Sequence, residues 1–201
     1  MSTLPKICGR EDIPALFNAM GLLGSGVEVG VQAGGFSSTL RSCWHGELLY
    51  LVDRWRHDPG YIDTANVDQD EQERLYRDVQ EMFANDDTVH IIREGSCAAA
   101  QLFDDESLDW IYLDADHSYA AVVADLAAWW PKLKEGGVFS GHDYVDGVLL
   151  DSDFGVKSAV DQFAQGHGLQ IFTTREDPIF MSWYCQKPPG AKKIQVTNRP
   201  S

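Results

Sequence analysis

The feature that most constrains the fold is the alternation of short apolar runs with segments of helical period. Seven runs have the length of β-strands, and several are apolar at every position rather than at every second one. Strands with two apolar faces are typical of a sheet that is covered by helices on both sides. The alternation therefore predicts βαβ units and an α/β fold with a largely parallel sheet.

The expected elements can be placed by residue number. The strands are expected at Val27–Val31, Leu48–Val52, Val89–Arg93, Trp110–Leu113, Val138–Ser140, Leu169–Thr173 and Phe180–Tyr184. Helical stripes that we expect to face the core are formed by Leu75, Val79, Met82 and Phe83, by Tyr119, Val122, Val123, Leu126 and Trp130, and by Val156, Val160 and Phe163. The last two strands are joined by a short polar loop, which predicts a hairpin and a sheet that ends antiparallel.

Length and composition indicate one domain of ordinary globular type. We expect this domain over residues 1–187 and a C-terminal tail over residues 188–201, in a chain of 201 residues without internal repeats. The 31 acidic residues outnumber the 16 Lys and Arg residues, and the net charge of -15 opposes binding to nucleic acid and to anionic membranes. A leader-like start and a spanning apolar run are not seen, so a cytoplasmic location is expected. Four widely spaced cysteines are typical of reduced thiols.

A glycine turn follows the first expected strand. Gly30 and Gly34 permit positive φ and a close approach of ligand to backbone, at the sheet edge where such folds bind ligands. Gln32 occupies the position at which the dinucleotide fingerprint requires its second glycine. About 20 residues later, Asp53 ends the second strand, where an acid accepts hydrogen bonds from ribose hydroxyls.

The first-strand acid Glu28 distinguishes two cofactors that both contain ribose. Its carboxylate would repel a pyrophosphate but attract the ammonium group of an amino-acid ligand. S-adenosylmethionine carries an ammonium group and a sulfonium cation and has no phosphate. We therefore expect S-adenosylmethionine, and an NAD(P)-dependent oxidoreductase stays open as the alternative.

Two polar clusters follow the fourth and fifth expected strands. They contain Asp114, Asp116 and His117, and His142 and Asp143. Adjacent parallel strands bring both clusters to one edge of the sheet, where charged groups are costly to gather unless they bind a cation, exchange protons or meet a polar ligand. The structural alternative is capping of the next helix, for example by Ser118.

Together these motifs resemble a bacterial branch of the Rossmann-like S-adenosylmethionine-dependent methyltransferases. The matching segments are Glu28–Ser37, Val52–Trp55, Asp114–Tyr119 and Gly141–Tyr144, and the likeness runs from about residue 24 to residue 184. The resemblance implies a three-layer αβα sandwich whose seven strands have the order 3-2-1-4-5-7-6, with the last strand antiparallel. It also implies cofactor contacts from Glu28, Gly30, Gly34, Asp53, Arg54, Trp55, Gly95, Ser96 and Asp114. For Gly95 and Ser96, a loop and helix cap is the alternative.

The later clusters are also similar to those of metal-dependent sugar O-methyltransferases. By this resemblance Asp114 matches a metal ligand, His117 the general base and Asp143 a later acidic ligand. His142 stands where a second later acid would be, and imidazole suits Mn²⁺ better than Mg²⁺. The implied metal set is Asp114, His142 and Asp143, the implied catalytic set is His117, Asp114 and His142, and the need for a cation stays open.

The segment Arg54–Asn66, between the second and third strands, is longer than a typical connection. We expect it to form a lid over the cofactor, with an insertion packed on the next helix as the alternative. The resulting hypothesis is O-methylation of a hydroxyl on a small metabolite or sugar, with S-adenosylhomocysteine as product. A homodimer is a family-based expectation, and a non-catalytic cofactor-binding domain is a further alternative.

Overall fold

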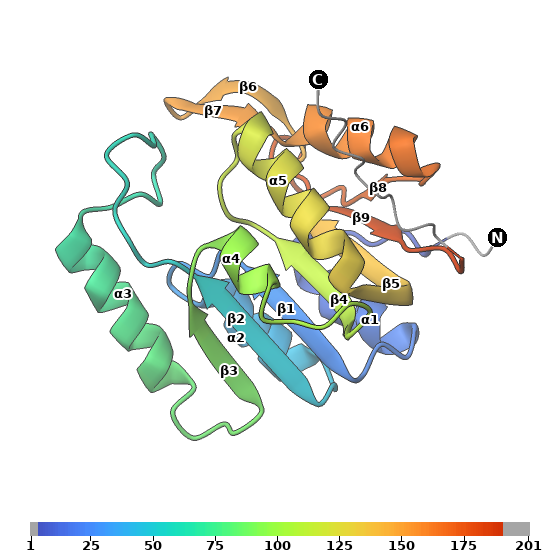
Figure 1. Cartoon of the computed structure of the whole chain (residues 1–201), viewed down its shortest axis with the longest axis horizontal. Helices are drawn as coiled ribbons and strands as arrows, with labels where there is room; N and C mark the ends of the chain where they lie inside the picture. The colour runs from blue at the N-terminus through green and yellow to red at the C-terminus, as the bar shows by residue number, and fades with distance from the viewer. Residues whose placement is uncertain (1–3, 191–201) are drawn as a thin grey trace, which may run out of the picture.

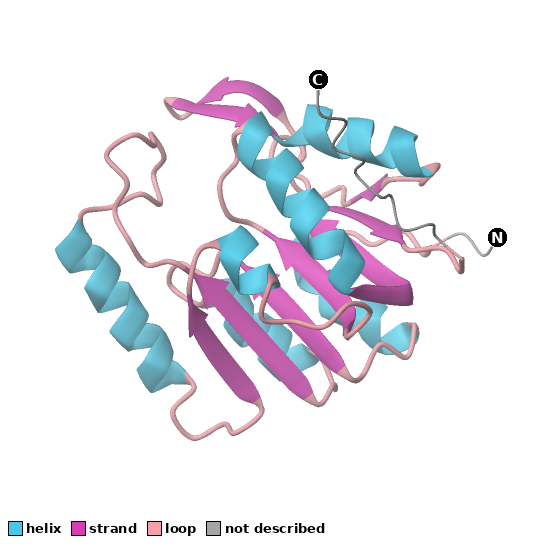
Figure 2. Cartoon of the chain, in the orientation of Figure 1, coloured by secondary structure: helices cyan, strands magenta, loops and turns pink. Residues whose placement is uncertain are grey.

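The computed structural model describes residues 4–190, which form three layers with helices on both sides of one main sheet (Figures 1 and 2). The sheet has the order β3-β2-β1-β4-β5-β9-β8. Its strands are β1 (Ser25–Val29), β2 (Leu48–Asp53), β3 (Val89–Arg93), β4 (Leu108–Leu113), β5 (Leu133–Gly141), β8 (Phe172–Thr173) and β9 (Trp183–Gln186). The helices are η1 (Arg10–Asp12), α1 (Ile13–Ala19), α2 (Gly35–Cys43), α3 (Gln69–Met82), α4 (Ser96–Ala100), α5 (Tyr119–Trp129), η2 (Trp130–Lys132) and α6 (Val156–His167).

The strand order confirms the predicted arrangement 3-2-1-4-5-7-6. Strands β1 to β5 pair in parallel, whereas β9 runs antiparallel between β5 and β8. The predicted final hairpin is thus present, although its second strand is Trp183–Gln186 rather than 180–184. The first strand also lies two residues earlier than predicted, because the last two residues of the apolar run belong to the turn that follows it.

Two hydrophobic cores lie on opposite faces of the sheet. Strand β4 is buried at all six positions, and its residues alternate between the cores. Ile111 and Leu113 pack in the core beneath α4, α5 and α6, whereas Trp110 and Tyr112 pack in the core beneath α1, α2 and α3. This alternation explains why five of the six residues of β4 are hydrophobic, the exception being Asp109, which binds Lys134.

Three residues of the predicted helical stripes are not core residues. Met82, Tyr119 and Val123 are 40–47% exposed, and the prediction that they face the core is wrong. Tyr119 lies at the first turn of α5, where its hydroxyl donates a hydrogen bond to Gln162 of α6. Val123 lies inside α5 beside the buried Val122, so periodicity placed the core stripe but made it too wide there.

A second, two-stranded sheet was not predicted. It consists of β6 (Asp146–Leu149) and β7 (Ser152–Gly155), which form an antiparallel hairpin. Leu150 and Asp151 in its turn have φ of 51° and 64°, conformations that usually belong to Asn and Gly in a tight hairpin. The missing turn signal and the short, exposed first strand hid this hairpin from sequence analysis.

Other expectations concern features outside the sheet. All four cysteines are free, as predicted. Within residues 4–190, no helix combines the length and apolar character needed to cross a membrane. The predicted tail falls largely on residues 191–201, which lie outside the described residues.

Candidate active site

A cleft of about 880 Å³ lies at the carboxyl edge of the main sheet. Its walls include residues that follow β1 to β5, which is where ligands bind in sheets of this kind. The predicted site residues that line it are Glu28, Gly30, Asp53, Arg54, Gly95, Ser96, Asp114, His117, His142 and Asp143. Gly34 and Trp55 were also predicted as ligand contacts, but they are not among the lining residues.

The two glycines of the elbow between β1 and α2 serve backbone packing. Gly30 has φ of +94°, and a Cβ atom there would lie 1.9 Å from the carbonyl oxygen of Asp114. Gly34 has φ of +77°, and a Cβ atom there would lie 3.1 Å from Cγ2 of Val79 in α3. The elbow therefore packs against β4 and α3, and Gly34 supports the cleft from behind.

Asp53 holds the elbow in place from the end of β2. Its Oδ2 accepts hydrogen bonds from the backbone amides of Val31 and Gln32, at 2.9 and 2.8 Å. Its Oδ1 accepts one from the amide of Trp55 at 2.8 Å. The Trp55 indole is fully buried and donates to the carbonyl oxygen of Gln32 at 2.9 Å. Trp55 thus supports the elbow, while Asp53 reaches the cleft with oxygens that can accept further hydrogen bonds.

Three residues around this sheet edge have backbone conformations that L-amino acids rarely adopt. Gln32, Trp55 and Asp143 have φ of 52°, 38° and 52° and follow β1, β2 and β5. Such conformations cost of the order of 1–3 kcal/mol each and cluster at functional sites. Their position at three strand ends is consistent with a binding site at this edge.

A buried acid and a cation lie at the base of the cleft. Glu28 is 1% exposed, and its carboxylate accepts a hydrogen bond from the hydroxyl of Ser37 in α2. Burial raises the pKa of Glu28 to about 8, although the Ser37 hydrogen bond and the charge of Arg10 act in the opposite direction. Near neutral pH the Glu28 side chain is therefore largely protonated in the ligand-free protein.

Arg10 is a functional-site residue that sequence analysis missed. Its Nη2 donates to Oδ2 of Asp114 at 2.7 Å, and its guanidinium carbon lies 4.1 Å from the ring centroid of Phe36. Burial by itself would lower the pKa of Arg10, but Asp114 and neighbouring acids raise it above its ordinary value. Arg10 belongs to no motif, and only the packing of the N-terminal segment brings it into the cleft.

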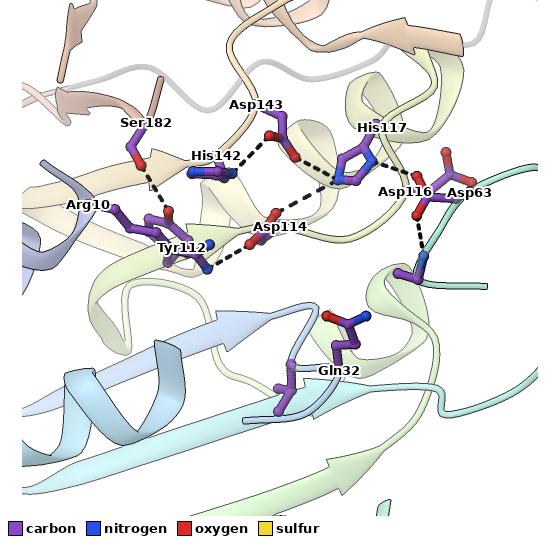
Figure 3. Close-up of polar contacts among 12 residues, drawn as sticks. Arg10, Gln32, Asp63, Tyr112, Asp114, Asp116, His117, His142, Asp143 and Ser182 are labelled. Carbon is purple, nitrogen blue, oxygen red and sulfur yellow. Dashed lines mark hydrogen bonds and ion pairs between the residues drawn. The ribbon is translucent and has the colours of Figure 1, made fainter. Parts of the chain in front are cut away.

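His117 lies among three carboxylates (Figure 3). Its Nδ1 is 3.1 Å from Oδ2 of Asp63, while its Nε2 is 3.0 Å from Oδ2 of Asp143 and 3.7 Å from Oδ1 of Asp114. Burial would lower the pKa of His117, but the three carboxylates raise it to about 12. Without ligand, the imidazole is therefore a cation that balances part of the acidic charge.

Three side chains can direct donor atoms to one point. One ligand atom from each of Asp114, His117 and Asp143 lies within 4.8 Å of the others, a distance suited to a shared cation. His142, predicted as a ligand, is not in this group, and its Nδ1 lies 2.9 Å from Oδ1 of Asp143. Burial raises the pKa of Asp143, but His117 and His142 lower it well below its usual range. Two carboxylates and one imidazole form a donor set that suits Mn²⁺ or another transition metal ion.

Comparison with known protein families identifies the chain. A family model described as "Methyltransferase domain" matches residues 27–144, which include the elbow and both polar clusters. The chain belongs to this methyltransferase family. No curated protein matches the sequence closely enough to count as a relative.

Solved structures show the same fold at low sequence identity. The methyltransferase is similar to an O-methyltransferase from Bacillus cereus solved with S-adenosylhomocysteine, with 15% identity over 88% of this chain and 80% of that chain and a TM-score of 0.61. A Staphylococcus aureus protein described as a caffeoyl-CoA O-methyltransferase has 13% identity over 87% and 80% of the two chains, also with a TM-score of 0.61. A Clostridium thermocellum protein described as an rRNA methylase has 14% identity over 93% and 98% and a TM-score of 0.64.

These findings confirm an enzyme that depends on S-adenosylmethionine and has the predicted Rossmann-like fold. The oxidoreductase alternative and the non-catalytic alternative gain no support from them. The site residues of the methyltransferase stay predictions, with the placements described above.

At the far end of the cleft, Ser96 of the methyltransferase has a structural role in addition to any ligand contact. Its hydroxyl donates to Oδ1 of Asp125 at 2.5 Å and accepts from Nε1 of Trp129 at 2.9 Å. Gly95 occupies the N-cap position of α4, which begins at Ser96, but no side chain makes a capping hydrogen bond there. Burial raises the pKa of Asp125 to about 6, and its carboxylate also lines the cleft.

The predicted lid segment borders the cleft of the methyltransferase. It connects β2 to α3 and contributes Tyr61, Asp63 and Asn66 to the walls. Gln72 of α3 donates a hydrogen bond to the carbonyl oxygen of Ala65 at 3.1 Å, so the segment also packs on the next helix. The segment therefore has the position expected of a lid, and it also packs on α3, as the alternative interpretation predicted.

Proposed function

We propose that the methyltransferase transfers a methyl group to a hydroxyl oxygen of a small metabolite, such as a sugar or glycoside. The observation that carries this proposal is the group formed by Asp114, His117 and Asp143 in the cleft. An amine acceptor needs no such group once its nitrogen is neutral. A hydroxyl acceptor must lose a proton, and the group offers a place for that proton.

The reaction requires alignment and one proton transfer. A lone pair of the acceptor oxygen attacks the methyl carbon, the carbon–sulfur bond breaks, and its electron pair stays on the sulfur of S-adenosylhomocysteine. Alignment of oxygen, methyl carbon and sulfur supplies much of the rate. The hydroxyl proton passes to the Nε2 atom of His117, which faces Asp114 and Asp143.

His117 accepts this proton only when its imidazole is neutral. In the ligand-free cleft three carboxylates stabilise the imidazolium form. The sulfonium of the bound cofactor adds positive charge to the same cleft, and a nearby positive charge lowers the pKa of an imidazole. We expect cofactor binding to move the pKa of His117 toward the range in which it acts as a base.

A divalent cation fits the same donor set. Asp114, His117 and Asp143 would hold it, and when bound it would lower the pKa of a coordinated hydroxyl. Arg10 and the protonated His117 imidazole already supply positive charge to these acids, so a cation would have to compete with Arg10 and displace the Nε2 proton of His117. Turnover with added Mn²⁺, with added Mg²⁺ and with a chelator would show whether a cation is needed.

The walls near this group indicate the nature of the acceptor. They include Leu150 and Phe154 of the β6–β7 hairpin, together with Phe180 and Asp177 before β9. Apolar rings beside acidic oxygens suit a neutral acceptor that combines hydroxyl groups with an apolar face. Glycosides have this combination.

The test is formation of S-adenosylhomocysteine from S-adenosylmethionine with panels of glycosides, simple sugars, catechols and amines. We expect turnover with a hydroxyl acceptor and a product heavier by one methylene unit. The substitution His117→Gln should lower kcat by about 10²- to 10⁴-fold. Affinity for S-adenosylhomocysteine, measured by calorimetry, should change by less than about threefold. Methylation of amines alone, or equal turnover by wild type and His117→Gln, would refute the proposal.

A further inference from the structure

We propose that Asp63, in the loop between β2 and α3, is a positioning residue for His117. Its Oδ2 lies 3.1 Å from Nδ1 of His117, and the Asp63 side chain is only 5% exposed. A hydrogen bond at one imidazole nitrogen fixes which nitrogen is presented on the other side of the ring. With Nδ1–H bonded to Asp63, Nε2 is the atom that faces Asp114 and Asp143.

The same loop fixes His117 through a second residue. The hydroxyl of Tyr61 accepts a hydrogen bond from the backbone amide of His117 at 3.2 Å and donates one to Oδ2 of Asp63 at 3.2 Å. On another side, the ring of Phe154 stacks on the imidazole with centroids 4.8 Å apart and planes 8° apart. The imidazole ring is therefore held by the loop between β2 and α3, by the β6–β7 hairpin and by the segment after β4 to which His117 belongs.

Asp63 is itself fixed within the loop. Its Oδ1 accepts a hydrogen bond from the amide of Ala65 at 2.7 Å. The side chain of Asn66 closes the loop by donating to the carbonyl oxygen of Asp58 at 2.7 Å and accepting from the Asp58 amide at 2.9 Å. Gln72, which is buried in α3, anchors Ala65. The carboxylate thus reaches His117 from a supported segment, which is the requirement for a positioning role.

The consequence is that the lid contributes to the catalytic arrangement and does more than cover the cofactor. Opening of this loop would remove the partner of Nδ1 and the hydrogen bond to the His117 amide at the same time. The conclusion holds whether Nε2 accepts a proton or binds a cation, since both roles need that nitrogen to face the cleft. The role of Asp63 deepens the proposed function. A kinetic test of this role rests on the proposed function, whereas a spectroscopic test of the His117 ring does not.

The experiment compares Asp63→Asn with the matched control Asp58→Asn in the full chain. Asp58 lies in the same loop, binds Arg54 and the Gly60 amide, and makes no recorded contact with His117. An asparagine at position 63 can turn its NH₂ group toward Nδ1 and favour the tautomer that carries its proton on Nε2. We expect Asp63→Asn to lower kcat by about 10- to 100-fold, with KM for S-adenosylmethionine changed by less than about threefold. Asp63→Glu should restore part of kcat, and Asp58→Asn should keep it.

Nuclear magnetic resonance of ¹⁵N-histidine-labelled protein provides the readout that does not need an acceptor. The Nδ1–H signal of His117, assigned by its loss in His117→Gln, should be downfield and slowly exchanging in the wild type and in Asp58→Asn. It should move upfield or disappear by exchange in Asp63→Asn, while circular dichroism shows an intact fold. An unchanged Nδ1–H signal in Asp63→Asn, or an equal loss of kcat in Asp58→Asn, would overturn the proposal. If no hydroxyl acceptor is methylated, the proposed function fails, and the spectra still decide the role of Asp63.

Discussion

At the scale of single residues, the cleft is governed by how burial and neighbouring charge act on each ionisable group. Glu28 and His117 are both deeply placed, yet their charge states differ. Burial leaves Glu28 protonated near neutral pH, because the Ser37 hydroxyl and the charge of Arg10 do not offset desolvation. His117 keeps its proton because three carboxylates surround it. Burial disfavours the charged form of both groups, yet one becomes a neutral acid and the other stays a cation.

Glu28 leads to a prediction about pH and stability. Its pKa is about 8 in the folded protein and about 4.5 when unperturbed, so the stability linked to its proton is complete below about pH 4.5 and is lost as the pH rises to about 8. We expect the free energy of unfolding of the wild type to fall relative to that of Glu28→Gln by up to about 1.4 kcal/mol per pH unit between these values. Urea denaturation of both proteins at pH 5, 6, 7 and 8 measures this difference. A constant difference across the series would contradict the assignment.

At the scale of elements, the site is built by connections that follow strands. The elbow after β1 and the turn after β5 contribute residues to the cleft at one edge of the sheet, and the β6–β7 hairpin adds Ser152 and Phe154 to its walls. The elbow is shaped mainly by contact with the neighbouring strand end. Its first glycine is required because the backbone of Asp114 leaves no room for a Cβ atom.

The two glycines Gly30 and Gly35 give a matched test of this packing. In Gly30→Ala, a methyl group would lie 1.9 Å from the carbonyl oxygen of Asp114 at a φ of +94°, so we expect a loss of stability of about 3 kcal/mol or more. In Gly35→Ala nothing lies within 4 Å of the new methyl group, and this first residue of α2 favours alanine. Denaturant unfolding should therefore show stability equal to or above that of the wild type for Gly35→Ala. Equal losses of stability in Gly30→Ala and Gly35→Ala would contradict this explanation, because only the methyl group at position 30 would clash with the Asp114 backbone.

At the scale of the whole molecule, a strongly acidic protein uses a cationic cofactor, for which we predict the cleft as the binding site. The net charge of -15 attracts a sulfonium ion and repels polyanions. The shared fold with an rRNA methylase does not alter this, because fold alone does not define the substrate. The net charge is thus the property on which our expectation of a small acceptor, rather than nucleic acid, rests.

Binding to RNA tests this inference directly. We expect no change in the fluorescence anisotropy of a labelled structured RNA on addition of the full-length protein at about 150 mM salt. Lowering the salt should not produce strong binding, because the protein has few cations to replace condensed counterions. Binding that weakens steeply as salt increases would contradict the expectation and would reopen nucleic acid as a substrate.

The strand order was implied by the family resemblance, whereas the sequence by itself determined the layered fold and the edge of the sheet that holds the candidate site. These features follow from local properties: apolar periodicity, a glycine turn, an acid at the end of β2, and polar clusters after β4 and β5. The start of α5 could also be predicted from neighbouring residues, since the Ser118 hydroxyl accepts a hydrogen bond from the Ala121 amide and caps the helix as expected.

Only the tertiary structure decided which groups meet in the cleft. Arg10 reaches Asp114 across 104 residues, and Asp63 reaches His117 across 54, so no spacing rule connects these pairs. Tertiary packing also makes Trp55 and Gly34 supports of the elbow, a role that sequence analysis did not predict. The physical reason is that secondary structure depends on neighbours in the chain, whereas ionisation and ligand geometry depend on charges that folding brings together.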